Sequence, residues 1–84
     1  MCIRDRYGNM YVFDDDPTIG QSLKIYGEYC HPEIEIIKKF IDSNSFFIDI
    51  GANIGTHTIG LAPYVGTVLA FEPAPENVDL LKKN

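Results

Sequence analysis

The sequence predicts an α/β fold in which parallel strands alternate with helices, and three observations support this prediction. Two short and almost continuous apolar runs, residues 46–50 and 67–71, are typical of strands buried on both faces of a parallel sheet. A glycine-bearing turn, residues 51–55, and a helix-like stretch, residues 56–61, separate them. A second amphipathic stretch, residues 75–83, follows. This order is a βαβ unit that opens a doubly wound domain.

Residues 1–31 are predicted to form an N-terminal extension. Residues 1–6 look unlike the start of a packed element, and we expect either a non-native leader or a frayed native terminus. Residues 7–13 are rich in aromatic and β-branched side chains and predict a strand. Residues 19–26 predict a short helix that Gly27 ends.

Residues 32–84 are predicted to form a truncated half-domain. A helix is expected to open at Pro32, because proline suits the first helical position. Its apolar side chains recur at helical spacing and predict a face laid on the core: Ile34, Ile37 and Ile41, with Phe40 beside them. With only two strands and uncovered strand edges, we expect the isolated chain to be inactive and poorly stable.

Composition and charge narrow the class of protein. A net charge of −5 argues against binding to nucleic acid, which requires a basic face. No apolar run approaches the ~18 residues of a membrane span, and no secretory signal is readable. Cys2 and Cys30 lack metal-ligand spacing, so we expect no metal, and a reduced pair of cysteines favours a cytoplasmic location.

The segment between the first predicted strand and the following helix is where doubly wound folds bind nucleotide-like ligands. Gly51 permits a sharp turn and a close approach of a ligand to the backbone. Asn53 is among the few residues other than glycine that tolerate left-handed geometry, and Gly55 permits close packing where the helix begins. Asp49, just before the turn, adds a carboxylate. We predict a ligand-binding loop here.

Glu72 follows the second predicted strand, at the same edge of the sheet. A carboxylate at this place can accept hydrogen bonds from both hydroxyls of a ribose. The dinucleotide pattern GxGxxG, started at Gly51, requires glycines where Asn53 and Thr56 stand. Asp49 suits the positive charges of S-adenosylmethionine better than a diphosphate. No Gly-Lys-Ser/Thr follows the turn, which excludes a P-loop.

Two motifs resemble one family closely. Residues 47–58, FIDIGANIGTHT, and residues 70–77, AFEPAPEN, are similar to the DxGANxG loop and the FEPxPxN segment of FkbM-type methyltransferases. The resemblance covers residues 46–84 well, includes the helix from Pro32, and is loose over residues 7–29.

The resemblance implies a partial Rossmann-like class I methyltransferase fold, with its first two parallel strands present and the later strands missing. It implies an S-adenosylmethionine-dependent enzyme that methylates an oxygen of a small-molecule or sugar acceptor. It also implies cofactor binding by Asp49, Gly51, Asn53 and Gly55, with Glu72 on the ribose. No catalytic residue is assigned within the chain.

Simpler interpretations stay open beside this one. Asp49 can merely cap the turn, Glu72 can cap the helix near Pro75, and His57 is expected to be exposed or packed against a loop. His31 is expected to begin a helix and do no more. At the level of the whole chain, the alternatives are a fragment of a NAD-type oxidoreductase and a non-catalytic Rossmann-like module.

Overall fold

The computed structural model describes all 84 residues. In chain order, the elements are β1 Cys2–Asp5, β2 Gly8–Tyr11, α1 Ile19–Tyr26, α2 His31–Lys38, β3 Phe46–Ile50, α3 Thr56–Leu61, the 3-10 turn η1 Ala62–Tyr64, β4 Thr67–Phe71 and α4 Pro75–Lys83. The boundaries predicted for α1, α3, α4 and both central strands are therefore confirmed. None of the helices has the length and apolar character needed to cross a membrane.

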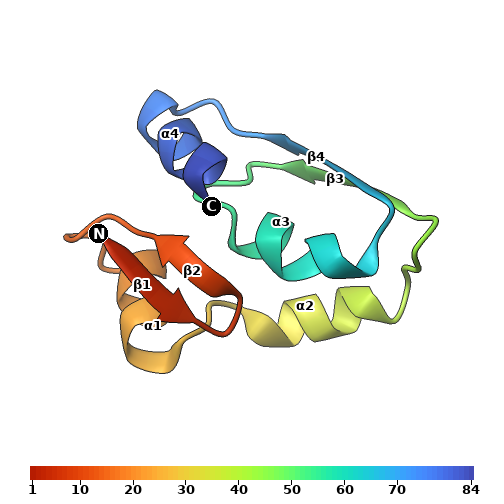
Figure 1. Cartoon of the computed structure of the whole chain (residues 1–84), viewed down its shortest axis with the longest axis horizontal. Helices are drawn as coiled ribbons and strands as arrows, with labels where there is room; N and C mark the ends of the chain where they lie inside the picture. Colours follow the sequence, from red (N-terminus) through yellow and green to blue (C-terminus); the bar gives the residue numbers. More distant parts are fainter.

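Strands β3 and β4 pair in parallel, and α3 is the helix that connects them. The register places Phe46 beside Thr67 and Ile50 beside Phe71. In Figure 1 the strand pair, α3 and α2 lie one below the other as successive layers. The predicted α/β unit with a parallel sheet is confirmed, and it is consistent with a partial methyltransferase-like fold.

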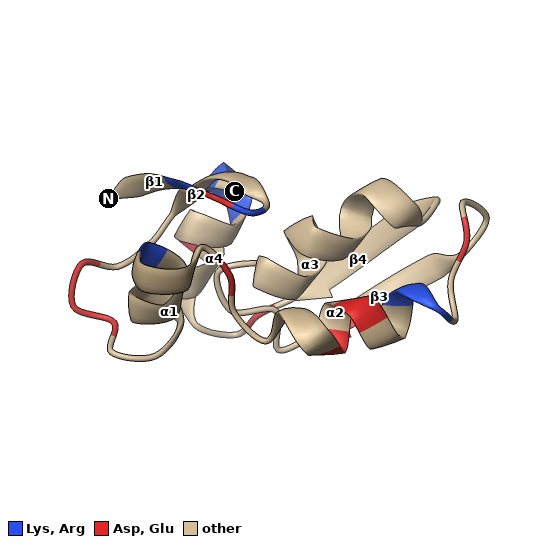
Figure 2. Cartoon of the chain, turned by 90° about the horizontal axis from the view of Figure 1, so that it is seen from below, with Lys and Arg blue, Asp and Glu red and all other residues tan.

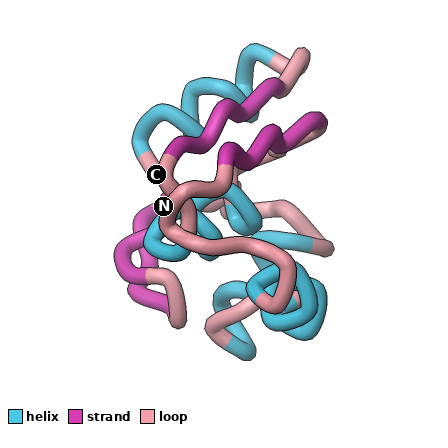
Figure 3. Tube along the Cα trace, turned by 90° about the vertical axis from the view of Figure 1, so that its right-hand side faces the viewer, coloured by secondary structure: helices cyan, strands magenta, loops and turns pink.

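One face of this strand pair is uncovered, so the expectation of strands buried on both faces is wrong. Side chains alternate between the two faces of a strand. The partly buried residues of the two strands are Phe47, Asp49, Val68 and Ala70, and Asp49 on this face contacts Thr58 of α3. The residues that alternate with these along the strands have their side chains on the opposite face, where Ile48 is 52% exposed and Ile50 is 82% exposed. Figure 3 shows the two strands side by side, with most of the helices below them. Several apolar side chains of these strands are therefore left exposed by the chain itself.

Residues 2–5 form a strand, so the expectation that residues 1–6 do not begin a packed element is wrong; the non-native leader stays a prediction. β1 pairs antiparallel with β2, and Cys2 lies beside Tyr11. The N–H of Val12 also donates to the carbonyl of Met1 at 2.8 Å. β2 is shorter than the predicted strand 7–13, because Arg6 and Tyr7 form the turn of this hairpin. The polar sequence of β1 gives no strand signal, and its pairing with β2 supplies the hydrogen bonds.

Helix α2 ends earlier than its apolar spacing predicts. Its last residue is Lys38, after which the N–H of Phe40 donates to the carbonyl of Ile37, a tighter 3-10-type contact. Ile41 therefore lies beyond the helix, and Phe40 is 81% exposed. Ile34 is the fully buried side chain of α2. The expectation of one continuous apolar face through Ile41 is wrong.

The main hydrophobic core joins the N-terminal segment to the loop after β3. Its buried members are Met10, Val12, Ile19, Leu23 and Ile54. Ile54 has no exposed surface, although it belongs to the glycine-bearing loop. The core thus lies directly beneath the loop that the sequence singled out, and the hairpin and α1 support that loop from below. The division at residue 31 stays a prediction.

Charged residues do not gather on one face. The seven basic residues are spread over β1, its turn, α1, the end of α2 and the end of α4, as Figure 2 shows for the ribbon. The loop after β2 carries three adjacent acids, Asp14, Asp15 and Asp16. This distribution agrees with the net charge of −5.

Candidate cofactor-binding loop

The loop Gly51–Gly55 joins β3 to α3 at the carboxyl end of the parallel strand pair. Three of its residues have positive φ: 82° at Gly51, 56° at Asn53 and 103° at Gly55. The left-handed conformation predicted as tolerable for Asn53 is thus the one that it adopts. These three residues give the backbone its sharp path between strand and helix.

Strand β4 holds the loop through main-chain N–H groups. The N–H groups of Gly51 and Ala52 both donate to the carbonyl of Phe71, at 2.8 and 3.0 Å. The N–H of Asn53 donates to Oε1 of Glu72 at 2.8 Å. The N–H of Gly55 donates within the loop to the carbonyl of Ala52. Most loop donors are therefore satisfied by the protein itself.

Glu72 ties together the loop and the start of α4. Besides Asn53, its carboxylate accepts hydrogen bonds from the N–H of Ala74 at 3.1 Å and from Nδ2 of Asn77 at 3.2 Å, both at Oε2. The hydrogen bonds from Ala74, Asn53 and Asn77, in that order of size, lower the pKa of Glu72. A carboxylate has about four acceptor positions, so these three contacts leave room for a further donor. Glu72 thus contacts the residue before α4 and a side chain in its first turn, but it accepts no hydrogen bond from a backbone N–H of the helix itself, so it is not a helix cap in the strict sense.

Asp49 lies one residue before the end of β3, on the face that α3 covers. Its Oδ2 accepts a 2.6 Å hydrogen bond from the hydroxyl of Thr58 in α3. Its other oxygen, Oδ1, has no hydrogen-bond partner in the protein. Thr58 thus orients the Asp49 side chain. Apart from the presence of a threonine in the first turn of the predicted helix, no sequence pattern indicates this role.

The two glycines that flank the loop serve different needs. A Cβ built on Gly55 would lie 2.7 Å from Cδ1 of Leu81 in α4, so this glycine permits the packing of α4. A Cβ built on Gly51 would meet nothing within 4 Å, and Gly51 is exposed. The open space over Gly51 fits a ligand that approaches the backbone, as expected for a cofactor loop.

The structure brings the five predicted residues to one edge of the sheet: Asp49, Gly51, Asn53, Gly55 and Glu72. Their cofactor-binding roles stay predictions. Asn84 was not anticipated. Its side chain accepts from the N–H of Tyr11 at 2.6 Å and donates to the carbonyls of Tyr11 and Ile54, at 3.1 and 2.7 Å. These partners are distant in sequence, so no local pattern indicates the contact.

Both histidines make contacts that the sequence did not predict. His57 is partly buried, and its Nε2 lies 3.3 Å from Oε1 of Glu33 in helix α2, so the expectation of an exposed or loop-packed histidine is wrong. His31 begins α2 as expected, but it also contacts the hydroxyl of Tyr7 and lines a cavity. This cavity has a volume of about 290 Å³ and lies between the hairpin turn, α2, α3 and η1. No residue of the loop Gly51–Gly55 lines it.

Comparison with curated proteins finds a relative named Methyltransferase 1 from Beauveria bassiana (strain ARSEF 2860). It is 36% identical over 67 residues, and the match covers 73% of this chain and 27% of the relative. The chain thus spans about a quarter of the length of that protein. No protein-family model matches the chain. No solved structure matches it either.

The parallel α/β unit with its glycine-bearing loop and the likeness to this relative agree with each other. Together they support a methyltransferase relationship for the chain.

Proposed function

We propose that the protein containing this chain is an S-adenosylmethionine-dependent methyltransferase of the FkbM type, and that Asp49–Glu72 contributes to its cofactor site. The 2.8 Å hydrogen bond between the N–H of Asn53 and Glu72 carries the proposal, because it holds the glycine loop against the acid of the neighbouring strand. When bound, S-adenosylmethionine would supply a methyl group: the acceptor oxygen would bond to the methyl carbon as the carbon–sulfur bond breaks, the hydroxyl would lose its proton, and S-adenosylhomocysteine would leave. The proposed acceptor is a hydroxyl of a small molecule or sugar.

The two acids have distinct parts in this proposal. Glu72 is kept ionised by the hydrogen bonds that lower its pKa, and an ionised carboxylate accepts from a ribose hydroxyl. Asp49 places a second carboxylate, oriented by Thr58, at the same edge of the sheet. A negative charge there favours the ammonium and sulfonium groups of the cofactor. Gly51 leaves the backbone accessible between them.

The hydrogen bonds of the loop argue against the dinucleotide alternative. A diphosphate is bound at such loops by backbone N–H groups that point at the ligand. Here the N–H groups of Gly51 and Ala52 donate to the carbonyl of Phe71, and that of Asn53 donates to Glu72. These three donors are not free for phosphate oxygens, which leaves the N–H groups of Ile54 and of the first turn of α3 for such a contact. S-adenosylmethionine carries no phosphate.

We assign no catalytic residue within these 84 residues. Methyl transfer is an in-line displacement that depends on the position of the acceptor relative to the sulfonium. In this proposal the loop Gly51–Gly55, Asp49 and Glu72 bind and orient the cofactor, and the two acids place negative charge beside it. The acceptor and any group that removes its proton are left to the rest of the enzyme that we propose.

Calorimetric titration of the full-length protein, expressed from the complete coding sequence that contains this chain, tests the proposal. We expect binding of S-adenosylhomocysteine and none of NAD. Glu72→Gln is expected to weaken S-adenosylhomocysteine binding about tenfold or more, since hydrogen bonds to charged groups are worth ~1.5–3 kcal/mol. Glu76→Gln is the matched control, because Glu76 is exposed in the first turn of α4 and makes none of these contacts.

Three results would contradict the proposal. Tighter binding of NAD than of S-adenosylhomocysteine would favour the oxidoreductase alternative. Equal affinity of the parent and of Glu72→Gln for S-adenosylhomocysteine would mean that the acid of β4 does not contact the cofactor. Binding without methyl transfer to any hydroxyl acceptor would favour a non-catalytic module.

A further inference from the structure

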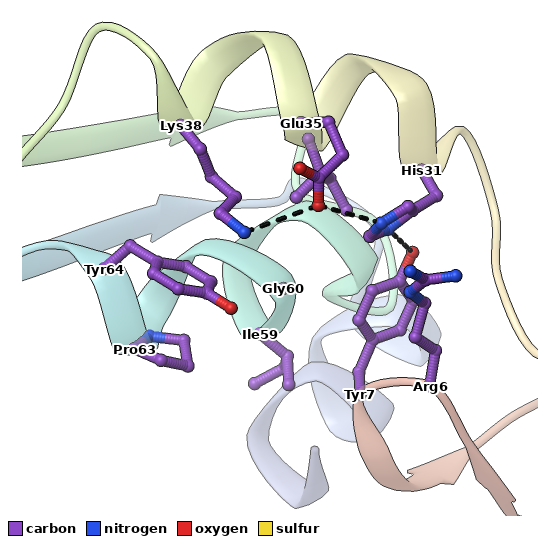
Figure 4. Close-up of a pocket in the computed structure, with 10 residues that line it drawn as sticks. Arg6, Tyr7, His31, Glu35, Lys38, Ile59, Gly60, Pro63 and Tyr64 are labelled. Atoms are coloured by element: carbon purple, nitrogen blue, oxygen red, sulfur yellow. Dashed lines mark hydrogen bonds and ion pairs between the residues drawn. The ribbon is translucent and has the colours of Figure 1, made fainter.

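We propose that the cavity between the hairpin turn and helices α2 and α3 binds a small neutral ligand that carries several hydroxyl groups. Figure 4 shows the cavity, whose polar lining consists of Arg6, Tyr7, His31, Glu35, Lys38 and Tyr64. It shares no residue with the proposed cofactor site. This inference therefore does not depend on the proposed function.

The size of the cavity limits the ligand. Its volume of about 290 Å³ lies at the lower end of ordinary small-molecule pockets, about 300–1,000 Å³. Gly60 of α3 allows the walls to come this close. A Cβ at Gly60 would lie 2.8 Å from Cδ1 of Ile34 and 3.3 Å from Cε1 of Tyr7. The space suits a single substituted ring rather than a nucleoside cofactor.

A chain of polar contacts runs along the wall of the cavity. The hydroxyl of Tyr7 lies 3.3 Å from Nδ1 of His31. Nε2 of His31 lies 3.0 Å from Oε1 of Glu35, and Nζ of Lys38 approaches the same oxygen at 3.4 Å. Figure 4 shows these side chains converging on Glu35 from either side. Both protein contacts of Glu35 use one oxygen, which leaves Oε2 as an acceptor.

His31 helps to position Glu35 at the cavity. Its Nε2 is buried and lies 3.0 Å from Oε1 of Glu35. The Glu35 side chain itself is 51% exposed, so its second oxygen, Oε2, is the acceptor that a ligand hydroxyl can reach.

The charges around the cavity favour a neutral ligand over an anion. Arg6 pairs with Glu28 at 2.8 Å, and Lys38 pairs with Glu35 and also lies 4.1 Å from the centre of the Tyr64 ring. Each cation therefore has its own anion, and no unpaired positive charge remains for a phosphate or carboxylate. What remains is a mixture of donors and acceptors. Hydroxyl groups both donate and accept, so they match this mixture.

Titration of the full-length protein with three probes tests the assignment: myo-inositol, its monophosphate and cyclohexanol. We expect saturable binding of myo-inositol, no tighter binding of the monophosphate, and binding of cyclohexanol at least about tenfold weaker, because most of the hydrogen bonds are lost. Absence of saturable myo-inositol binding would overturn the proposal. So would a monophosphate that binds tenfold tighter, which indicates an anion site, or cyclohexanol that binds equally well, which indicates apolar filling.

Two substitutions connect the binding to the cavity. Glu35→Gln is expected to weaken myo-inositol binding about tenfold, and Tyr7→Phe, which keeps the ring, a few-fold. Glu76→Gln on α4 serves as the control and should have no effect. Myo-inositol binding that is unchanged in both Glu35→Gln and Tyr7→Phe would overturn the assignment to this cavity.

The affinity for S-adenosylhomocysteine, measured on the same proteins, separates the two proposals. It should be unchanged by Glu35→Gln and by Tyr7→Phe, because neither residue belongs to the cofactor loop. Myo-inositol binding without S-adenosylhomocysteine binding would contradict the proposed function and leave this inference standing. Binding of S-adenosylhomocysteine without binding of myo-inositol would overturn this inference and leave the proposed function standing.

Discussion

The main-chain N–H of Asn53 donates a 2.8 Å hydrogen bond to Oε1 of Glu72, which joins the loop after β3 to the residue after β4. The acid that we propose as the ribose ligand is thus also a support of the loop that faces the same ligand. Its ionisation state therefore affects both binding and the shape of the site.

Stability should fall in acid partly because of Glu72. Hydrogen bonds from Ala74, Asn53 and Asn77 hold its pKa below the ordinary value of 4.5. A lowered pKa in the folded state stabilises the protein above the unfolded-state pKa, and this contribution is lost as the pH falls through the folded-state pKa. We expect the thermal midpoint of the parent to drop more steeply below pH 4.5 than that of Glu72→Gln. Parallel pH curves for the two proteins would contradict this assignment.

The flanking glycines should respond differently to alanine. Gly55→Ala combines left-handed strain with a Cβ 2.7 Å from Leu81, and we expect a loss of about 2–4 kcal/mol in the free energy of unfolding. Gly51→Ala carries the strain alone, with open space around the new Cβ, and should cost about 1–2 kcal/mol. Chemical denaturation of the full-length protein measures both. An equal cost would mean that the contact with Leu81 relaxes freely.

Ile54 should be critical for stability although it lies in a loop. It is fully buried in the core beneath the loop, with Met10, Val12, Ile19 and Leu23. Ile54→Ala is expected to cost about 2–5 kcal/mol through lost burial and a residual cavity. Ile25→Ala is the matched control, because Ile25 is 58% exposed on α1 and should change stability by less than about 0.5 kcal/mol. Similar losses for the two variants would mean that the core is not packed as described.

The uncovered face of β3 and β4 should make the isolated 84-residue chain associate with itself. Ile48 and Leu69 are neighbours in the parallel register and are 52% and 44% exposed. Exposed apolar strands with free edges favour association. We expect the double variant Ile48→Thr, Leu69→Thr to be less associated than the parent in light scattering, since threonine keeps strand propensity. A monomeric parent with a cooperative thermal transition would contradict both this prediction and the expected poor stability.

The parts of the structure that depend on local sequence were predictable. Continuous apolar runs defined β3 and β4, and helical spacing bounded by glycine or proline defined α1, α3 and α4 with the bounds observed. Left-handed geometry at Asn53 followed from the side-chain chemistry of asparagine, and the structure has it. The common edge for Asp49 and Glu72 followed from parallel pairing, because the carboxyl ends of parallel strands meet.

Contacts between distant segments were decided by the tertiary structure. β1 is a strand because β2 pairs with it, α2 ends before Ile41, and the cavity around His31 needs the hairpin turn and two helices to form. The support of the loop by Ile54 and Asn84 likewise joins residues far apart in the chain. Local pattern fixes backbone preferences, which act over a few residues. Burial and hydrogen-bond pairing between segments depend on how the whole chain packs.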